Sequence, residues 1–190
     1  MRILLAILVF VGVVYGQTPK PCLAPYVWEA KVIQYDISKQ FEMRSRMAYD
    51  ARNQRIRVVD KVNLEDKKDN FATLFLYQEG KEYKLNMKTK ECKVIDLTRP
   101  FRPVRVPNNA TFYGETTIGS LAAEGAGVIV QLWGGQTEHG RYAGSWTLRG
   151  CGPVSEVYFS NKTGVVRTDF FDITAGILDP DIFIPPKECM

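Results

Sequence analysis

The sequence of 190 residues has a single histidine, His139, and lacks the common catalytic signatures. It contains no Gly-x-Ser-x-Gly turn, no phosphate-binding glycine loop with its lysine, no dinucleotide fingerprint and no histidine pair at metal-ligand spacing. His139 lies in a glycine-rich stretch, where a general base has no fixed neighbours to position it. These absences predict a protein that is not an enzyme and that needs no organic cofactor.

Long apolar runs are also missing, with one exception at the amino terminus. There Arg2 precedes an apolar run from Ile3 to Val14, and Gly16 follows, which is the pattern of a secretory signal peptide. The run is shorter than the roughly 20 residues that a membrane-spanning helix needs. We therefore expect a signal peptide over residues 1–16 and one exported domain over residues 17–190. The formal net charge of +4 is too small to indicate nucleic-acid binding.

Cysteine is scarce, and no two cysteines have the spacing of a zinc or redox motif. The chain has four cysteines, Cys22, Cys92, Cys151 and Cys189. An even number behind a signal peptide predicts two disulfides, for which three pairings are possible. Sequons that begin at Asn109 and Asn161 predict a glycoprotein, because both fall in expected turns of an exported chain.

Helical patterns of useful length are absent, whereas short alternating runs recur between turn residues. Met43–Tyr49 and Arg55–Val59 alternate and predict a hairpin. Val165–Ile173 is apolar on both faces, which predicts a strand in the middle of the core. Gly134–Gly144 is rich in glycine and is expected to be a flexible loop. The pattern predicts an all-β fold of about ten mostly antiparallel strands, a sandwich or half-barrel.

Large apolar side chains on these strands exceed what one face of a thin sheet needs. Two tightly packed layers explain the excess, and a strongly curved sheet that leaves a hydrophobic pocket explains it as well. The residues that we expect to line such a pocket are Leu74, Leu76, Tyr83, Leu85, Val128, Val130, Trp133, Trp146 and Phe170.

Two groups of charged residues are candidates for contact with a ligand. The basic group is Arg44, Arg46, Arg55 and Arg57. Alternating arginines are typical of a solvated strand face, and the alternative is that they attract an anionic headgroup. The acidic group is Asp172, Asp179 and Asp181, whose oxygens suit calcium as ligands. The spacing lacks the pattern of a calcium-binding EF-hand, and Asp179 before Pro180 is equally typical of a helix cap.

Several short motifs follow one another along residues 17–190. They are Pro21-Cys22-Leu23-Ala24-Pro25 with Trp28-Glu29, Leu76-Tyr77-Gln78-Glu79-Gly80, Pro100-Phe101-Arg102-Pro103, Cys151-Gly152-Pro153-Val154 and Phe170-Phe171-Asp172-Ile173. In this order they resemble the ependymins and ependymin-related proteins, and the resemblance covers essentially the whole expected domain.

The resemblance implies a fold, a pairing of cysteines and a kind of ligand. The fold is two curved antiparallel sheets around a hydrophobic pocket, similar to bacterial lipoprotein carriers, and the disulfides join Cys22 to Cys151 and Cys92 to Cys189. A homodimer in the extracellular space or the lysosomal lumen is implied, which binds lipids or other hydrophobic molecules without catalysis and makes peripheral contact with anionic membranes or matrix. The alternative function is an extracellular calcium-binding glycoprotein in cell–matrix adhesion.

Overall fold

The computed structural model describes residues 18–39, 41–64, 67–162 and 164–190. The expected signal peptide and Thr163 of the second sequon lie outside these residues. Among the described residues, no helix is long and apolar enough to cross a membrane.

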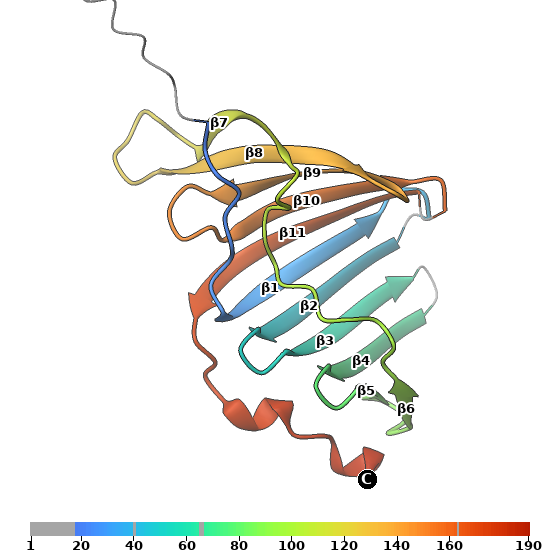
Figure 1. Ribbon diagram of the computed structural model, residues 1–190. Coiled ribbons are helices and arrows are strands. Elements are labelled where there is room, and N and C mark those ends of the chain that lie inside the picture. Colours follow the sequence, from blue (N-terminus) through green and yellow to red (C-terminus); the bar gives the residue numbers. More distant parts are fainter. Residues whose placement is uncertain (1–17, 40, 65–66, 163) are drawn as a thin grey trace, which may run out of the picture.

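The described residues form one antiparallel sheet (Figure 1). Its strands are β1 (Val27–Asp36), β2 (Phe41–Asp50), β3 (Arg55–Leu64), β4 (Lys67–Leu76), β5 (Lys81–Asn86), β6 (Cys92–Asp96), β7 (Thr111–Gly119), β8 (Gly127–Thr137), β9 (Gly140–Thr147), β10 (Pro153–Ser160) and β11 (Gly164–Ala175). Their spatial order is β6-β5-β4-β3-β2-β1-β11-β10-β9-β8-β7. Two short 3-10 helices follow β11, namely η1 (Pro180–Phe183) and η2 (Lys187–Cys189).

The all-β antiparallel fold class is confirmed, with one difference in the layers. The two expected sheets are halves of a single sheet, because β1 and β11 pair with each other and join them. The strand predicted over Val165–Ile173 lies within β11, which pairs with β1 on one side and β10 on the other. Its central position explains why it carries apolar residues on both faces.

The flexible loop expected over Gly134–Gly144 was a wrong prediction. Strand β8 continues to Thr137 and β9 begins at Gly140, so most of this stretch is a paired hairpin. The glycines here allow aromatic rings to pack onto the backbone. A Cβ added at Gly144 would lie 2.7 Å from the indole of Trp146, and a Cβ at Gly135 would lie 2.9 Å from the hydroxyl of Tyr142.

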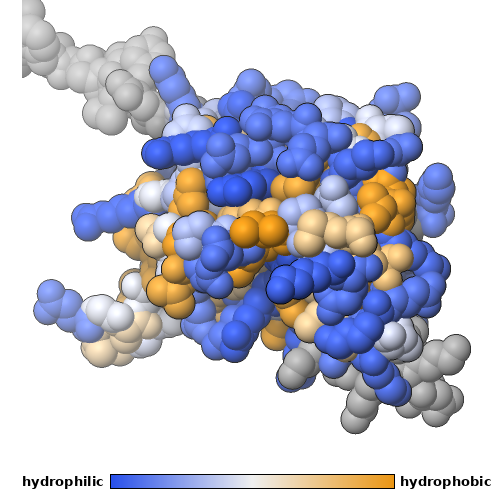
Figure 2. All heavy atoms as spheres, turned by 90° about the horizontal axis from the view of Figure 1, so that it is seen from below, coloured by the Kyte–Doolittle hydropathy of each residue, from blue (hydrophilic) through white to orange (hydrophobic). Residues whose placement is uncertain are grey.

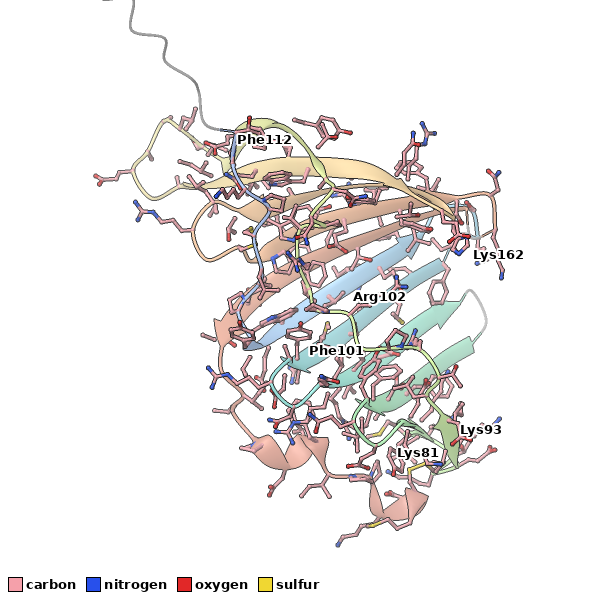
Figure 3. The ribbon with its side chains drawn as sticks, in the orientation of Figure 1. Lys81, Lys93, Phe101, Arg102, Phe112 and Lys162 are labelled. Carbon is pink, nitrogen blue, oxygen red and sulfur yellow. A yellow bond between two sulfur atoms is a disulfide. The ribbon has the colours of Figure 1, made fainter. Side chains whose placement is uncertain are left out.

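Side chains alternate between two faces of the sheet, which we call the covered face and the open face. The covered face carries Trp28, and its cover is a strap of residues 97–110 together with the N-terminal segment 18–26 (Figure 1). Phe101 belongs to this strap (Figure 3). The open face carries Lys31, and helix η1 covers one part of it through Phe183, which packs with Leu74 and Leu76.

Both disulfides have the pairing that the resemblance implies. Cys22–Cys151 attaches the N-terminal segment beside Val106, a strap residue that is completely buried. Cys92–Cys189 attaches helix η2 to the edge of the sheet at β6. Such bridges are typical of proteins in an oxidising compartment outside the cytosol.

The hydroxyl of Tyr49 holds the strap, and its removal should be measurable. It accepts a hydrogen bond of 2.9 Å from the backbone N–H of Val104, and its ring stacks on Phe101 at 5.9 Å between centroids. We expect Tyr49→Phe to lower the free energy of unfolding in urea by about 1 kcal/mol, because the N–H of Val104 loses its acceptor. The control is Tyr26→Phe, at a tyrosine that is 54% exposed, and it should leave the urea concentration at the midpoint of unfolding unchanged. Equal midpoints for both variants would contradict this role.

Candidate ligand groove

The side chains that we expected to line one pocket are divided between the two faces. Those on the open face are Leu74, Leu76, Tyr83, Leu85, Val128 and Val130, and those on the covered face are Trp133, Trp146 and Phe170. The structure therefore does not bring them together in one cavity. Leu74 and Leu76 are buried beneath helix η1, and Trp133 and Trp146 are buried beside the strap.

All four predicted arginines stand on the open face, but one of them, Arg55, lies outside the groove. Arg44 and Arg46 alternate along β2, and the pairing of β2 with β3 brings Arg57 to the same face. Arg55 instead belongs to the end of the sheet, where its Nε donates to Asp50 at 2.9 Å and its guanidinium lies 4.2 Å from the ring centre of Phe183.

Two adjoining hollows form a groove on the open face. Their volumes are ≈ 750 Å³ and ≈ 410 Å³, and both are lined by Lys31, Arg46, Val59 and Asp172. Volumes of this size are usual for sites that hold small molecules. Further lining residues are Ile33, Arg44 and Phe171 in the larger hollow, and Arg57, Ala48 and Ile182 in the smaller one.

The floor of the groove is apolar and its rim is basic. Phe171 is 47% exposed and Val59 is 37% exposed, although both stand in the middle strands of the sheet. The register places Lys31 opposite Arg46 and Arg46 opposite Val59, so charged and apolar side chains meet across neighbouring strands. Apolar side chains also gather in a band between hydrophilic ones on the side of the molecule that Figure 2 shows.

The positive charges on the rim differ in how far they are already neutralised. Lys31 lies 2.6 Å from Asp172, and Arg44 lies 2.5 Å from Glu42. Arg46 has neither an ion pair nor a hydrogen bond among the residues that the structure describes. Arg57 donates to the carbonyl oxygen of Ile182 at 3.1 Å, and burial lowers the pKa of its guanidinium. Arg46 is therefore the cation best placed to meet an anion.

Asp172 has a conformation that the sequence did not reveal. Its φ is +51°, and the pairing of β1 with β11 is irregular between Glu29 and Lys31, where Asp172 stands opposite. This bulge gives the open face both Phe171 and Asp172 as neighbours of Lys31. No local signal in the sequence predicts the bulge.

Two of the three aspartates proposed for calcium have other partners or roles. Asp172 pairs with Lys31, and the side chain of Asp179 caps η1 by accepting from the N–H of Asp181 at 3.0 Å. The described part of the chain contains no group of three or more His, Cys, Asp or Glu that could hold a metal ion. His139 is exposed beside Glu138, and both asparagines of the sequons, Asn109 and Asn161, are exposed.

These features define a class before any relative is considered. The protein is a disulfide-linked β protein with one curved sheet, which is covered by a strap on one face and has a groove on the other. Its family follows from comparison of sequences. The ependymin family model matches residues 65–189, and the chain belongs to this family.

Curated relatives agree with this assignment. Mammalian ependymin-related protein 1 of Rattus norvegicus is 36% identical over 176 residues, which cover 90% of this chain and 77% of the relative. Ependymin-2 of Carassius auratus is 28% identical over 144 residues, which cover 75% of this chain and 66% of the relative.

Two solved structures share the fold at low sequence identity. An uncharacterised conserved protein from Thermus thermophilus is 12% identical with a TM-score of 0.59, and the match covers 85% of this chain and 86% of that one. A chain of the Pseudomonas aeruginosa MucA/MucB complex is 10% identical with a TM-score of 0.50, over 86% of this chain and 57% of that one. At such identities the likeness concerns the fold alone.

Proposed function

We propose that this protein binds, without catalysis, an amphiphile with an acidic headgroup, such as an anionic lipid, in the open-face groove. The observation that carries the proposal is the position of Arg46, a cation with no acidic partner among the described residues, directly beside the exposed side chain of Val59. The apolar part of the ligand would lie along Val59 and Phe171, and the headgroup would meet Arg44 and Arg46.

Neither part of the groove is sufficient for binding by itself. Each cation near an anionic lipid surface contributes about 1 kcal/mol, and this attraction is screened by salt. Apolar contact adds roughly 25 cal/mol for each Å² removed from water. Exposed apolar side chains that adjoin each other and have a polar border often mark a binding surface. The combination favours a ligand that has both an apolar tail and an acidic group.

The experiment is cosedimentation with phosphatidylcholine vesicles that either contain or lack phosphatidylserine. We expect the protein to bind the vesicles with phosphatidylserine, and we expect high salt to weaken the binding because the rim of the groove acts through charge. The family resemblance includes both extracellular and lysosomal members, so the measurement is made at neutral and at acidic pH. Protein that stays in the supernatant with both kinds of vesicle at both pH values would refute the proposal.

A second copy of this chain is the competing occupant of the groove. The resemblance implies a homodimer, and exposed Phe171 and Val59 would suit an interface as well as a ligand. Sedimentation velocity of the Phe171→Glu variant separates the cases. A dimer that dissociates in this variant, together with unchanged vesicle binding, would assign the groove to dimerisation and remove it as a lipid site.

A further inference from the structure

A further hollow lies on the sheet where β7, β8, β9 and β10 stand side by side. Its volume is ≈ 730 Å³, and it shares no lining residue with the two hollows of the groove. Gln136 on β8 and Arg141 on β9 line it and stand opposite each other. Gln136 is on the same face as Val130, because an even number of residues separates them along β8. The hollow therefore opens on the same face as the groove, at the other half of the sheet.

The first predicted glycosylation site borders this hollow. Asn109 and Thr111, the first and third residues of the sequon, both line it. Asn109 stands in a turn at the end of the strap, where the N–H of Ala110 donates to the carbonyl oxygen of Pro107 at 2.9 Å. Val106, just before this turn, is completely buried and anchors it. A glycan on Asn109 would therefore begin at a fixed point beside the hollow, which lowers the entropic cost of placing its first sugar there.

Two exposed aromatic rings also line the hollow. Tyr113 is 64% exposed and Phe159 is 40% exposed. The ring of Tyr113 lies over the backbone of β8, because a Cβ added at Gly134 would be 2.8 Å from it. The irregular pairing of β7 with β8 between Phe112 and Gly114 gives Tyr113 this position. Such a ring offers a large apolar surface at the site where the glycan begins.

The polar side chains of the hollow are available to a ligand. Gln136 and Arg141 are exposed, and their side chains make neither an ion pair nor a hydrogen bond with any residue that the structure describes. The guanidinium donates hydrogen bonds, and the amide both donates and accepts them. Aromatic rings beside such groups match a sugar, because a sugar ring has an apolar C–H face and a border of hydroxyl and acetamide groups.

We propose that the glycan on Asn109 folds back into this hollow and that its first N-acetylglucosamine packs on Tyr113. The apolar face of the sugar contacts the ring, and its oxygens accept hydrogen bonds from Gln136 and Arg141. In glycosylation the amide nitrogen of Asn109 loses a proton and replaces the lipid pyrophosphate on the anomeric carbon of the oligosaccharide donor. The site depends on glycosylation at Asn109, which the sequon predicts, and not on lipid binding in the groove.

The test is a double-mutant cycle on the secreted glycoprotein, with the midpoint of thermal unfolding as the signal and peptide mass mapping to establish that Asn109 carries a glycan. Asn109→Gln removes the glycan and should lower the midpoint by about 2–4 °C, the effect of losing one aromatic contact in a chain of this length. Thr111→Ala removes the sequon but keeps Asn109, and it should have the same effect. In the Tyr113→Ser background, where the sugar has no ring to contact, Asn109→Gln should shift the midpoint by less than about 1 °C.

Two controls separate packing on Tyr113 from a general effect of glycans. Asn161→Gln removes the other predicted glycan, and its effect should be the same with and without the ring of Tyr113, which does not line the hollow at Asn161. Tyr26→Ser removes a ring that is 54% exposed and lies outside the hollow, and it should leave the effect of Asn109→Gln unchanged.

The proposal is overturned if Asn109→Gln shifts the midpoint equally in wild type and in Tyr113→Ser, because the glycan then extends into solvent. It is also overturned if the mapped peptide shows Asn109 without a glycan. Vesicle binding by the groove is measured separately, so that either proposal can fail without the other.

Discussion

Replacing Arg44 and Arg46 by glutamate is expected to weaken binding to vesicles that contain phosphatidylserine by about thirty-fold or more. Each arginine near an anionic surface contributes about 1 kcal/mol, so loss of two corresponds to about thirty-fold, and the added negative charges increase the loss. Both side chains are solvent-exposed on β2, so the fold should tolerate the change. Cosedimentation at low salt measures the effect, which should shrink at high salt.

The matched control carries the same change in net charge at another place. Arg102 on the strap and Arg149 in the turn after β9 are exposed arginines outside the groove. We expect Arg102→Glu with Arg149→Glu to reduce binding far less than the groove variant does. An equal loss in the two double variants would show that the vesicles respond to net charge, and the groove would lose its assigned role.

The fold could largely be predicted from the sequence, because the patterns that indicate its strands lie within short segments. Alternation in Met43–Tyr49 and Arg55–Val59 predicted the hairpin that β2 and β3 form. The apolar faces of Val165–Ile173 predicted a central strand, and β11 is one. The glycines of Gly134–Gly144 led to the wrong prediction of a loop, because glycine is typical both of loops and of strand backbone that an aromatic ring covers. Only the three-dimensional packing of Trp146 on Gly144 distinguishes these cases.

The groove could be predicted from the sequence only in part, because it depends on the register in which the strands pair. The sequence identified Arg44, Arg46, Arg55 and Arg57 as a group, and the pairing of β2 with β3 puts all four on one face. Lys31 and Phe171 were missed, because they reach the groove only through the pairing of β1 with β2 and β11. The predicted pocket residues lie on two opposite faces of the sheet. The sequence did not show this, because a strand that is apolar on both faces does not reveal which of its faces another element covers.

The two disulfides close loops of similar length but should differ in their effect on stability. The sequence separations are 129 for Cys22–Cys151 and 97 for Cys92–Cys189. Loop entropy alone gives each bridge roughly 4–5 kcal/mol and makes them differ by only about 0.3 kcal/mol. Cys151, however, is 5% exposed and packs with Trp133, Trp146 and Val106. Its removal therefore also disturbs a core.

We expect Cys22→Ala with Cys151→Ala to lower the free energy of unfolding by roughly 5 kcal/mol or more, and by at least about 1 kcal/mol more than Cys92→Ala with Cys189→Ala. The N-terminal segment would then lose its covalent link and be held by weaker contacts, such as the hydrogen bond of 3.1 Å from the N–H of Ala24 to the carbonyl oxygen of Val104. Urea denaturation, followed by tryptophan fluorescence, measures both variants. Equal losses would mean that the bridges act only on the unfolded chain, and a smaller loss for Cys22–Cys151 would show that the strap stays in place without it.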